Sequence, residues 1–266
     1  MINRKKFYED YRNFSYRTLS EYFISPGIRC KFDILKEYIG KRKFNVGIDL
    51  GCSGNSFLCF LENLVHKSFF DLAFLPLKQY SKTKLKRLKI GNIKQICYFH
   101  PLCGDLTQLP YRDKVFDFIL ALDVLEHVKN DKFAISELNR VLKKNGIAII
   151  TVPHKMKYYT NQDRLIGHYR RYEIQQINSL FAKYNLKNIR TFGVYGQCMK
   201  IADIQSTNPE KIEKSLLNLR NRYESNAGFR KFWEIIVKIS AKIMKIDAKY
   251  HSLKKIMNIA LIFEKI

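Results

Sequence analysis

The chain has 266 residues, of which 46% are hydrophobic, and a formal net charge of +24 at pH 7. This length is enough for one α/β domain with an elaboration and a buried core. No uninterrupted apolar stretch approaches the ~18 to 20 residues that a membrane-spanning helix needs, and no signal-peptide pattern opens the chain, so we expect a soluble or peripheral protein.

Cysteine usage and charge suggest a compartment and a class of partner. The six cysteines form no Cys-x-x-Cys pair, which is typical of reduced thiols in the cytoplasm. Residues 155–266 hold 22 basic and 9 acidic residues, a net charge of +13. This excess favours a polyanion or an acidic membrane face as partner, although Lys, Ile, Asn and Tyr are all abundant and a bias of composition explains the charge equally well.

The first 43 residues predict an N-terminal helical segment. Apolar positions at helical spacing indicate helices over Lys5–Tyr22 and Cys30–Ile39, with a break at Pro26-Gly27. The β-rich run Phe44–Leu50 then ends in a glycine, and Ser56–Leu64 has the pattern of a helix. Strand, loop and helix together make a first βα unit.

Alternating strands and helices continue along the chain. Further strands are predicted at Phe69–Phe74, Ile96–His100, Phe116–Leu122, Gly146–Val152, Asn188–Val194 and Ile256–Phe263. Helices are predicted at Asp131–Lys143, which Asn145-Gly146 would stop, and at Ile174–Tyr184. Such alternation predicts an α/β fold: a doubly wound, mostly parallel seven-stranded sheet with helices on both faces.

About sixty residues separate the last two strands, where the basic fold needs only a hairpin. We therefore divide the chain into an N-terminal segment (1–43), a core (44–195 and 256–266) and a helical lid or insertion (196–255). Within the insertion, a helix over 232–246 would place Trp233, Ile236, Ile243 and Met244 on one side. Packing of that side against the core is favoured, and contact with a membrane surface is the alternative.

The segment Val46-Gly-Ile-Asp-Leu-Gly-Cys-Ser-Gly-Asn-Ser56 turns from a strand into a loop rich in small residues. Backbone N–H groups and a carboxylate at the carboxyl edge of such a sheet suit a nucleoside-containing cofactor. Asp71, about twenty residues further on, would accept hydrogen bonds from the ribose hydroxyls. A glycine-containing turn is weak evidence alone, because any tight turn favours glycine.

Several later motifs occur in the same order and spacing as in one enzyme family. They are Gly104-Asp-Leu-Thr-Gln-Leu-Pro110, Phe116-Asp117, Val124-Leu-Glu-His-Val128 and Glu137-Leu-Asn-Arg-Val-Leu-Lys-Lys-Asn-Gly146. With Asp49-Leu-Gly-Cys52, they make the chain resemble the class I S-adenosylmethionine-dependent methyltransferases of the type 11 kind. The resemblance covers Val46 to Val152 and continues more loosely through Gly167-His-Tyr-Arg-Arg-Tyr172.

This resemblance implies S-adenosylmethionine as cofactor and a role for each matched residue. Asp49 and the backbone of Gly51, Cys52, Ser53 and Gly54 would face the methionine part, and Asp71 the ribose. Asp105 and Leu106 would face the adenine edge, and Asp123 would lie at the mouth between cofactor and acceptor. Ser53 and Asn55 stand where the family has glycines, and Asn55 would be the residue that adopts positive φ.

The acceptor end is predicted from the segments after the fourth and fifth strands. His127 is the first candidate for a general base, with His168 as a second. We place His154, Arg170, Arg171 and Tyr172 against the acceptor, where arginines bind phosphate or carboxylate bidentately. We expect no dedicated metal site, although Asp123-x-x-Glu126-His127 could hold a cation.

Absent motifs narrow the choice of acceptor. The chain has no Asn- or Asp-Pro-Pro-Tyr run after the fourth strand and no Pro-Cys pair there, which disfavours methylation of nucleic-acid bases. We therefore predict methyl transfer to an oxygen or nitrogen of a small molecule, lipid or glycan precursor. The alternatives are an RNA or protein methyltransferase, favoured by the basic run Lys82–Lys89 and the basic C-terminal part, and a non-catalytic partner protein with the same fold.

Overall fold

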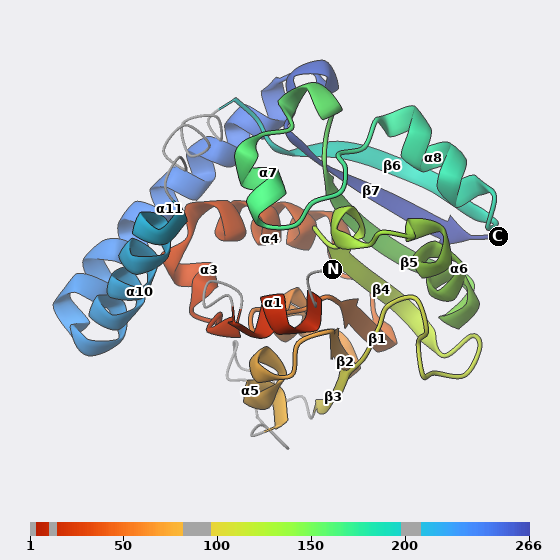
Figure 1. Ribbon diagram of the computed structural model, residues 1–266, viewed down its shortest axis with the longest axis horizontal. Coiled ribbons are helices and arrows are strands. Elements are labelled where there is room, and N and C mark those ends of the chain that lie inside the picture. The colour runs from red at the N-terminus through yellow and green to blue at the C-terminus, as the bar shows by residue number, and fades with distance from the viewer. Residues whose placement is uncertain (1–3, 11–14, 82–96, 198–208) are drawn as a thin grey trace.

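The structure, a computed structural model, describes residues 4–10, 15–81, 97–197 and 209–266 (Figure 1). A seven-stranded sheet with the order β3-β2-β1-β4-β5-β7-β6 forms its centre. Its strands are β1 (Phe44–Leu50), β2 (Leu64–Asp71), β3 (Tyr98–Cys103), β4 (Phe116–Leu122), β5 (Leu142–Pro153), β6 (Leu186–Tyr195) and β7 (Asn258–Lys265). Strands β1 to β5 pair in parallel, and β7 is antiparallel to β5 and β6. The predicted fold is confirmed.

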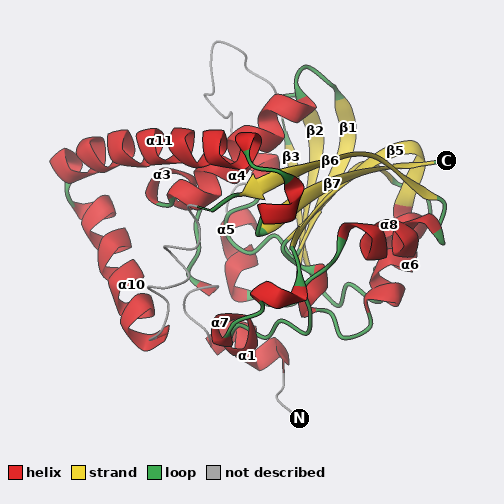
Figure 2. Ribbon diagram, turned by 90° about the horizontal axis from the view of Figure 1, so that it is seen from above, coloured by secondary structure: helices red, strands yellow, loops and turns green. Residues whose placement is uncertain are grey.

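Helices cover both faces of this sheet (Figure 2). The described helices are α1 (Arg4–Asp10), α3 (Glu21–Ile24), α4 (Pro26–Ile39), α5 (Lys78–Ser81), α6 (Asp131–Val141), α7 (Asn161–Leu165), α8 (Ile174–Ala182), α10 (Pro209–Ser225) and α11 (Ala227–Tyr250). Helices α6 and α8 contribute buried residues to one hydrophobic cluster, whereas α4 and α5 contribute to another. The sheet therefore lies between two cores.

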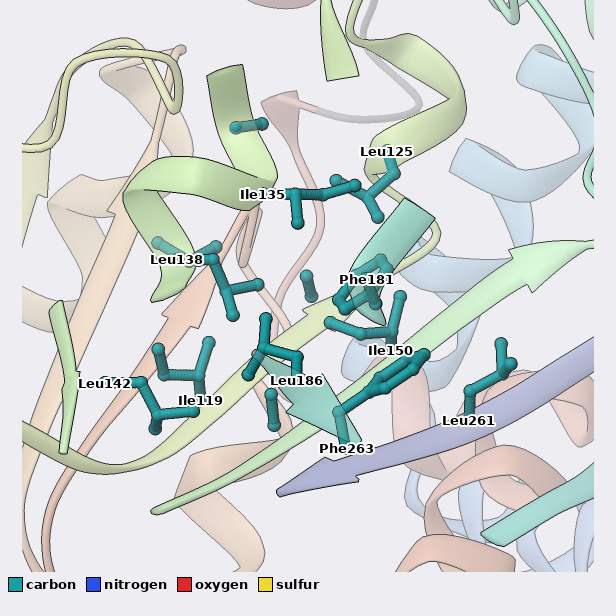
Figure 3. Packing of buried hydrophobic residues seen from close by; sticks show 14 of the residues in the cluster. Ile119, Leu125, Ile135, Leu138, Leu142, Ile150, Phe181, Leu186, Leu261 and Phe263 are labelled. Atoms are coloured by element: carbon teal, nitrogen blue, oxygen red, sulfur yellow. The ribbon is translucent and has the colours of Figure 1, made fainter. Parts of the chain in front are cut away.

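Strand β5 illustrates how one sequence supplies both cores. Ala148 and Ile150 belong to the cluster with α6 and α8, while Ile149 between them belongs to the cluster with α4. Successive side chains of a strand point to opposite faces, so a central strand needs a continuous apolar run. Figure 3 shows the first cluster, in which Phe181 of α8 stacks on Phe263 of β7 with ring centroids 4.0 Å apart.

The strand order reverses at β1, which pairs with β2 on one side and with β4 on the other. From β1 the strands β2 and β3 follow toward one edge of the sheet, whereas β4 and β5 follow toward the other edge. At such a point the loops after neighbouring strands diverge and leave a crevice at their carboxyl ends, where α/β proteins of this kind bind ligands.

The N-terminal segment differs from its prediction in two respects. The stretch Lys5–Tyr22 holds helix α1 and the start of α3, and residues 11–14 lie outside the described parts. Pro26 begins helix α4 and does not merely interrupt the helices. The Ser25 side chain caps the helix by accepting a hydrogen bond from the N–H of Ile28, and proline suits the first helical position because its missing N–H would have no partner there.

The predicted helix over Ser56–Leu64 is wrong. A short 3-10 helix spans Phe57–Phe60, and the chain enters β2 at Leu64, which pairs with Phe44 of β1. Strand β2 therefore begins five residues earlier than predicted and ends at Asp71. Phe57, Leu58 and Cys59 are all buried, so this segment lacks the polar face of a surface helix.

The predicted helix stop at Asn145-Gly146 is also wrong. Helix α6 ends at Val141, whose carbonyl accepts a hydrogen bond from the N–H of Val115. Leu142 is fully buried and already pairs with Phe116 as the first residue of β5. Asn145 does adopt positive φ, but inside an irregular part of that strand, where the register shifts between Phe116 and Phe118.

The insertion before β7 is helical, as predicted, and packs on the N-terminal helices and β6. Trp233 of α11 donates a hydrogen bond to the carbonyl of Ile24. The buried face of α11 is formed by Val237, Ala241 and Ala248. Ile243 is 55% exposed, so its predicted inward position is wrong. None of the helices in the described parts combines the length and apolar character that crossing a bilayer requires.

Candidate active site

A cavity of about 680 Å³ lies at the carboxyl edge of the sheet, beside the point where the strand order reverses. Loops after β1 to β4, the N-terminal segment and residues of the stretch 153–171 form its wall. Most predicted site residues line it: Asp49, Gly51, Cys52, Ser53, Asp71, Asp105, Leu106, Asp123, His127, His168 and Arg171. Among the described residues, none between 196 and 255 lines it, and the lid expected from the sequence stays a prediction.

The loop after β1 depends on two left-handed residues. Gly51 has φ of 71°, and a Cβ at this position would lie 2.5 Å from the Val124 side chain. Ser53 has φ of 46°, whereas Asn55 does not adopt positive φ, which corrects the prediction for this loop. Gly54 does not line the cavity, because its Cα faces the carbonyl oxygen of Arg17, from which a Cβ would be only 1.7 Å away.

Asp49 is a buried carboxylate at the end of β1, with only 3% of its surface exposed. Its Oδ2 accepts a hydrogen bond of 2.6 Å from the Ser56 hydroxyl. Burial raises the pKa of Asp49 to about 7, since the bond from Ser56 offsets only part of this effect and Asp71 adds to it. At neutral pH this side chain is therefore close to the midpoint of its titration.

Asp71 ends β2 and ties two loops together. Its Oδ2 accepts a hydrogen bond of 2.8 Å from the N–H of Ser53, and its Oδ1 accepts one of 2.9 Å from the N–H of Ala73. Burial raises its pKa, although both N–H groups work against that shift. The carboxylate thereby fixes the loop after β1 relative to the end of β2.

Asp105 follows β3 and organises a tight turn. Its Oδ1 accepts hydrogen bonds from the backbone N–H and the hydroxyl of Thr107, at 2.8 and 2.7 Å. The neighbouring Leu106 is 8% exposed, while Asp105 itself is exposed at the rim. The turn thus presents a carboxylate and an apolar side chain next to each other at the cavity.

Asp123, directly after β4, is held by an ion pair that the sequence does not reveal. Its backbone has φ of 56°, and its carboxylate pairs with the ammonium of Lys31 from helix α4. Its Oδ1 also accepts hydrogen bonds from Thr151 and Asn258, at 2.8 and 2.9 Å. Burial alone would raise the pKa of Asp123, but the Lys31 charge and these bonds lower it to about 2.

The other end of the cavity holds Glu126, His127 and His168, whose potential ligand atoms all lie within 4.8 Å of one another. The two imidazole rings have centroids 4.4 Å apart. Tyr8 of α1 contacts His127, with its hydroxyl 2.8 Å from Nδ1. His168 pairs through Nδ1 with Asp163 at 2.6 Å, and Asp163 also accepts two-pronged bonds from Arg171.

Three residues predicted to contact the acceptor lie outside the cavity. His154 is buried and its Nδ1 lies 2.8 Å from the carbonyl oxygen of Tyr172. The hydroxyl of Tyr172 donates to Asp131 and Leu125, and Arg170 pairs with Asp131 at 2.6 Å. The contacts of Tyr172 and Arg170 fasten the segment after β5 to the start of α6, and His154 packs within that segment.

The sequence missed several residues that line the cavity, among them Tyr8, Arg17, Lys31 and Asp163. Tyr8, Arg17 and Lys31 come from the N-terminal segment, which the sequence gives no reason to place over the sheet edge. One signal was available: Lys31 lies between Cys30 and Phe32 on the buried side of α4. A lysine on an apolar helix face needs a charged partner, which here is Asp123.

Comparisons with known proteins agree with this geometry. Residues 48–150 match the model of a family described as "Methyltransferase domain". An uncharacterized protein of Methanocaldococcus jannaschii is 32% identical over 122 residues, which are 46% of either chain. A ubiquinone biosynthesis O-methyltransferase of Rickettsia canadensis is 30% identical over 110 residues, 41% of this chain and 43% of that protein. These matches thus span less than half of the curated relatives.

Among solved structures, phosphoethanolamine N-methyltransferase 2 of Haemonchus contortus in complex with S-adenosyl-L-methionine has a TM-score of 0.60. It is 16% identical, and the match covers 100% of this chain and 60% of that one. This similarity shows a shared fold. Sheet order, cavity position and family match agree on a class I, Rossmann-like methyltransferase fold. Residues 48–150 are a methyltransferase domain of the S-adenosylmethionine-dependent family, as the sequence predicted.

Proposed function

We propose that this chain transfers a methyl group from S-adenosylmethionine to an oxygen or nitrogen of a small molecule, lipid or glycan precursor. The observation that carries the proposal is the continuity of one cavity. It joins the carboxylates of Asp49, Asp71 and Asp105 to a separate polar cluster of Glu126, His127 and His168. The first group suits a cofactor and the second an acceptor.

The donor set at the first end fits S-adenosylmethionine. Asp49 is buried and near its titration midpoint, so a cationic group beside it would favour its ionised form. Asp71 and Asp105 offer carboxylate oxygens to hydroxyl and amino groups, and Leu106 offers an apolar surface. When bound, the cofactor supplies an electrophilic methyl group, so the chain's task is to align the acceptor and exclude water.

At the second end, His127 and His168 are the candidates for a base where the acceptor carries a proton. His168 is oriented by Asp163, as imidazoles that move protons usually are oriented by a carboxylate. Tyr8 and Arg171 also line the cavity. The relatives support this acceptor class: one is named for O-methylation in ubiquinone biosynthesis, and one solved structure for N-methylation of phosphoethanolamine.

Methylation of RNA or protein is the second candidate, and the +13 charge of residues 155–266 is what favours it. The basic run Lys82–Lys89 lies outside the described residues. The third candidate is a non-catalytic partner protein whose fold no longer binds the cofactor.

A cytoplasmic location stays a prediction, supported by the five free thiols of the described residues.

Calorimetric titration with S-adenosylhomocysteine tests the cofactor site. We expect micromolar binding to the wild-type protein. Asp71→Ala should weaken it about 10- to 100-fold, because a hydrogen bond to a charged group contributes about 1.5 to 3 kcal/mol. Asp113→Ala is the matched control, since Asp113 pairs with Arg140 on the surface and away from the cavity. Absence of binding heat in the wild-type protein would contradict the proposal.

A further inference from the structure

Glu126 is in an unusual state for a buried carboxylate. Its side chain has no exposed surface, and neither Oε1 nor Oε2 has a hydrogen-bond partner in the described structure. A buried ionised carboxylate without a partner costs several kcal/mol. Its nearest cationic candidate is His168, whose Nε2 lies 3.8 Å from Oε1, too far for a hydrogen bond. A cation bound between these groups would therefore supply the partner that the Glu126 carboxyl lacks in the described structure.

The arrangement around His168 matches that of a metal-binding imidazole. Its Nδ1 lies 2.6 Å from Asp163, which leaves Nε2 directed toward Glu126. Metal-ligating histidines nearly always donate a hydrogen bond from their other ring N–H to an acceptor outside the metal's ligand set. Asp163 is itself fixed by Arg171 and by the N–H of Thr160 at the start of α7. His127 has a comparable outer partner in Tyr8, at 2.8 Å from Nδ1.

We propose that Glu126, His127 and His168 bind a divalent transition-metal ion of the zinc type. Two imidazoles and one carboxylate form a donor set that such ions favour, and three protein ligands leave a coordination position open. That position would face the cavity that these residues line and could take an acceptor oxygen or carboxylate. The role toward an acceptor depends on the proposed function, whereas metal binding does not. His127 and His168 would then both be ligands, and neither could serve as the base.

Zinc titration of chelator-treated protein, followed by calorimetry and by the visible absorption of cobalt(II) as substitute, tests this site. We expect one ion per chain. Glu126→Gln and His127→Ala should each weaken binding by more than about 100-fold. Asp163→Asn should weaken it by about 10- to 100-fold through loss of the outer partner. Thermal melting and binding of S-adenosylhomocysteine without metal show whether each variant is folded, and they test the proposed function separately.

The matched control uses a second histidine pair. His66 and His100 lie on the exposed side of β2 and β3, with Nδ1 and Nε2 3.3 Å apart, and could bind zinc adventitiously. The double variant His66→Ala/His100→Ala should retain the site. The proposal is overturned if the wild-type protein binds no stoichiometric zinc, or if binding survives Glu126→Gln and is lost in the His66/His100 double variant.

A different part of the molecule carries a second inference. Six large apolar side chains form an exposed stripe along helix α11: Phe232, Ile235, Ile239, Ile243, Ile246 and Tyr250, each between 49% and 79% exposed. Their spacing of three and four residues places them on one side of the helix, and the buried Val237, Ala241 and Ala248 lie on the other. The stripe extends along nearly the whole helix, about 30 Å.

A row of lysines follows this stripe. Lys231, Lys238, Lys242 and Lys249 are exposed and lie along one edge of it at the helical repeat. The two acidic residues of α11 are turned inward: Glu234 accepts a hydrogen bond from Tyr223, and Asp247 pairs with His251. We propose that this face of α11 lies on an anionic lipid bilayer. A second copy fits less well, since pairing two such faces would bring the lysine rows together.

Co-sedimentation with vesicles tests this surface. We expect binding to vesicles of phosphatidylcholine with phosphatidylglycerol, weaker binding at high salt, and little binding to phosphatidylcholine alone. Ile239→Glu/Ile243→Glu should abolish it, and Lys238→Gln/Lys242→Gln should reduce it about 30-fold. Phe133→Glu is the control, as Phe133 is equally exposed on α6. Absence of binding to anionic vesicles, or a dimer in solution that Ile239→Glu dissociates, would overturn the proposal.

Discussion

Two carboxylates of the cavity show how local partners set their protonation. Asp49 and Asp123 lie at the ends of the adjacent parallel strands β1 and β4; Asp49 is buried, whereas the side chain of Asp123 is 31% exposed. The pKa of Asp49 rises to about 7, since a single hydroxyl is its side-chain partner, whereas Lys31 holds the pKa of Asp123 at about 2. Asp123 is thus a fixed charge that anchors α4, and Asp49 is free to respond to a ligand.

Binding of S-adenosylhomocysteine should therefore depend on pH through Asp49. The amino group of the ligand favours the ionised carboxylate, so affinity is full above the pKa of about 7 and falls as protons compete below it. Between pH 8 and pH 6 we expect a loss of about tenfold in affinity, measured by calorimetry. Asp49→Asn should bind weakly and with little dependence on pH.

Ser56→Ala is the matched control for this effect. It removes the hydroxyl that donates to Asp49 and that lowers its pKa, so the loss of affinity should begin at a higher pH. If the wild-type affinity stays constant between pH 6 and pH 8, Asp49 does not face a cationic part of the ligand.

At the level of elements, the sequence predicted what local periodicity and family motifs determine. The strand Phe116–Leu122 is predicted residue for residue, because its central position requires a continuous apolar run. The region after Val141 was mispredicted because Asn145-Gly146 has the composition of a helix stop, yet Leu142 gains a buried place beside Phe116. Tertiary packing thus overrides local preference.

The same limit applies to the site. Motifs at the ends of the strands predicted Asp49, Asp71, Asp105 and Asp123 as neighbours, since parallel strands bring their carboxyl ends to one edge. Contacts across long sequence distances were not predictable, such as that between Lys31 and Asp123 or between Tyr8 and His127. The sequence also could not show which side chains of the run Gly167–Tyr172 face the cavity. His168 and Arg171 do, whereas Arg170 and Tyr172 face α6.

At the scale of the whole molecule, the cavity lies between parts that are far apart in the sequence. Tyr8, Arg17 and Lys31 of the N-terminal segment face Asp71, His168 and the other residues that the core contributes. A ligand that fills this space would contact both parts. Ligand binding should therefore stabilise the N-terminal helices together with the sheet.

Two measurements separate this coupling from binding to the core alone. At 100 times its dissociation constant, S-adenosylhomocysteine should raise the free energy of unfolding by about 2.7 kcal/mol. For a chain of this size that corresponds to roughly 5 to 10 °C in Tm. Amide hydrogen exchange should slow in α1 and α4 as well as in the loops after β1 to β3, because opening of the N-terminal segment would release contacts with the ligand. Slower exchange confined to those loops would show that the N-terminal segment opens independently, and Asp71→Ala should reduce both effects together.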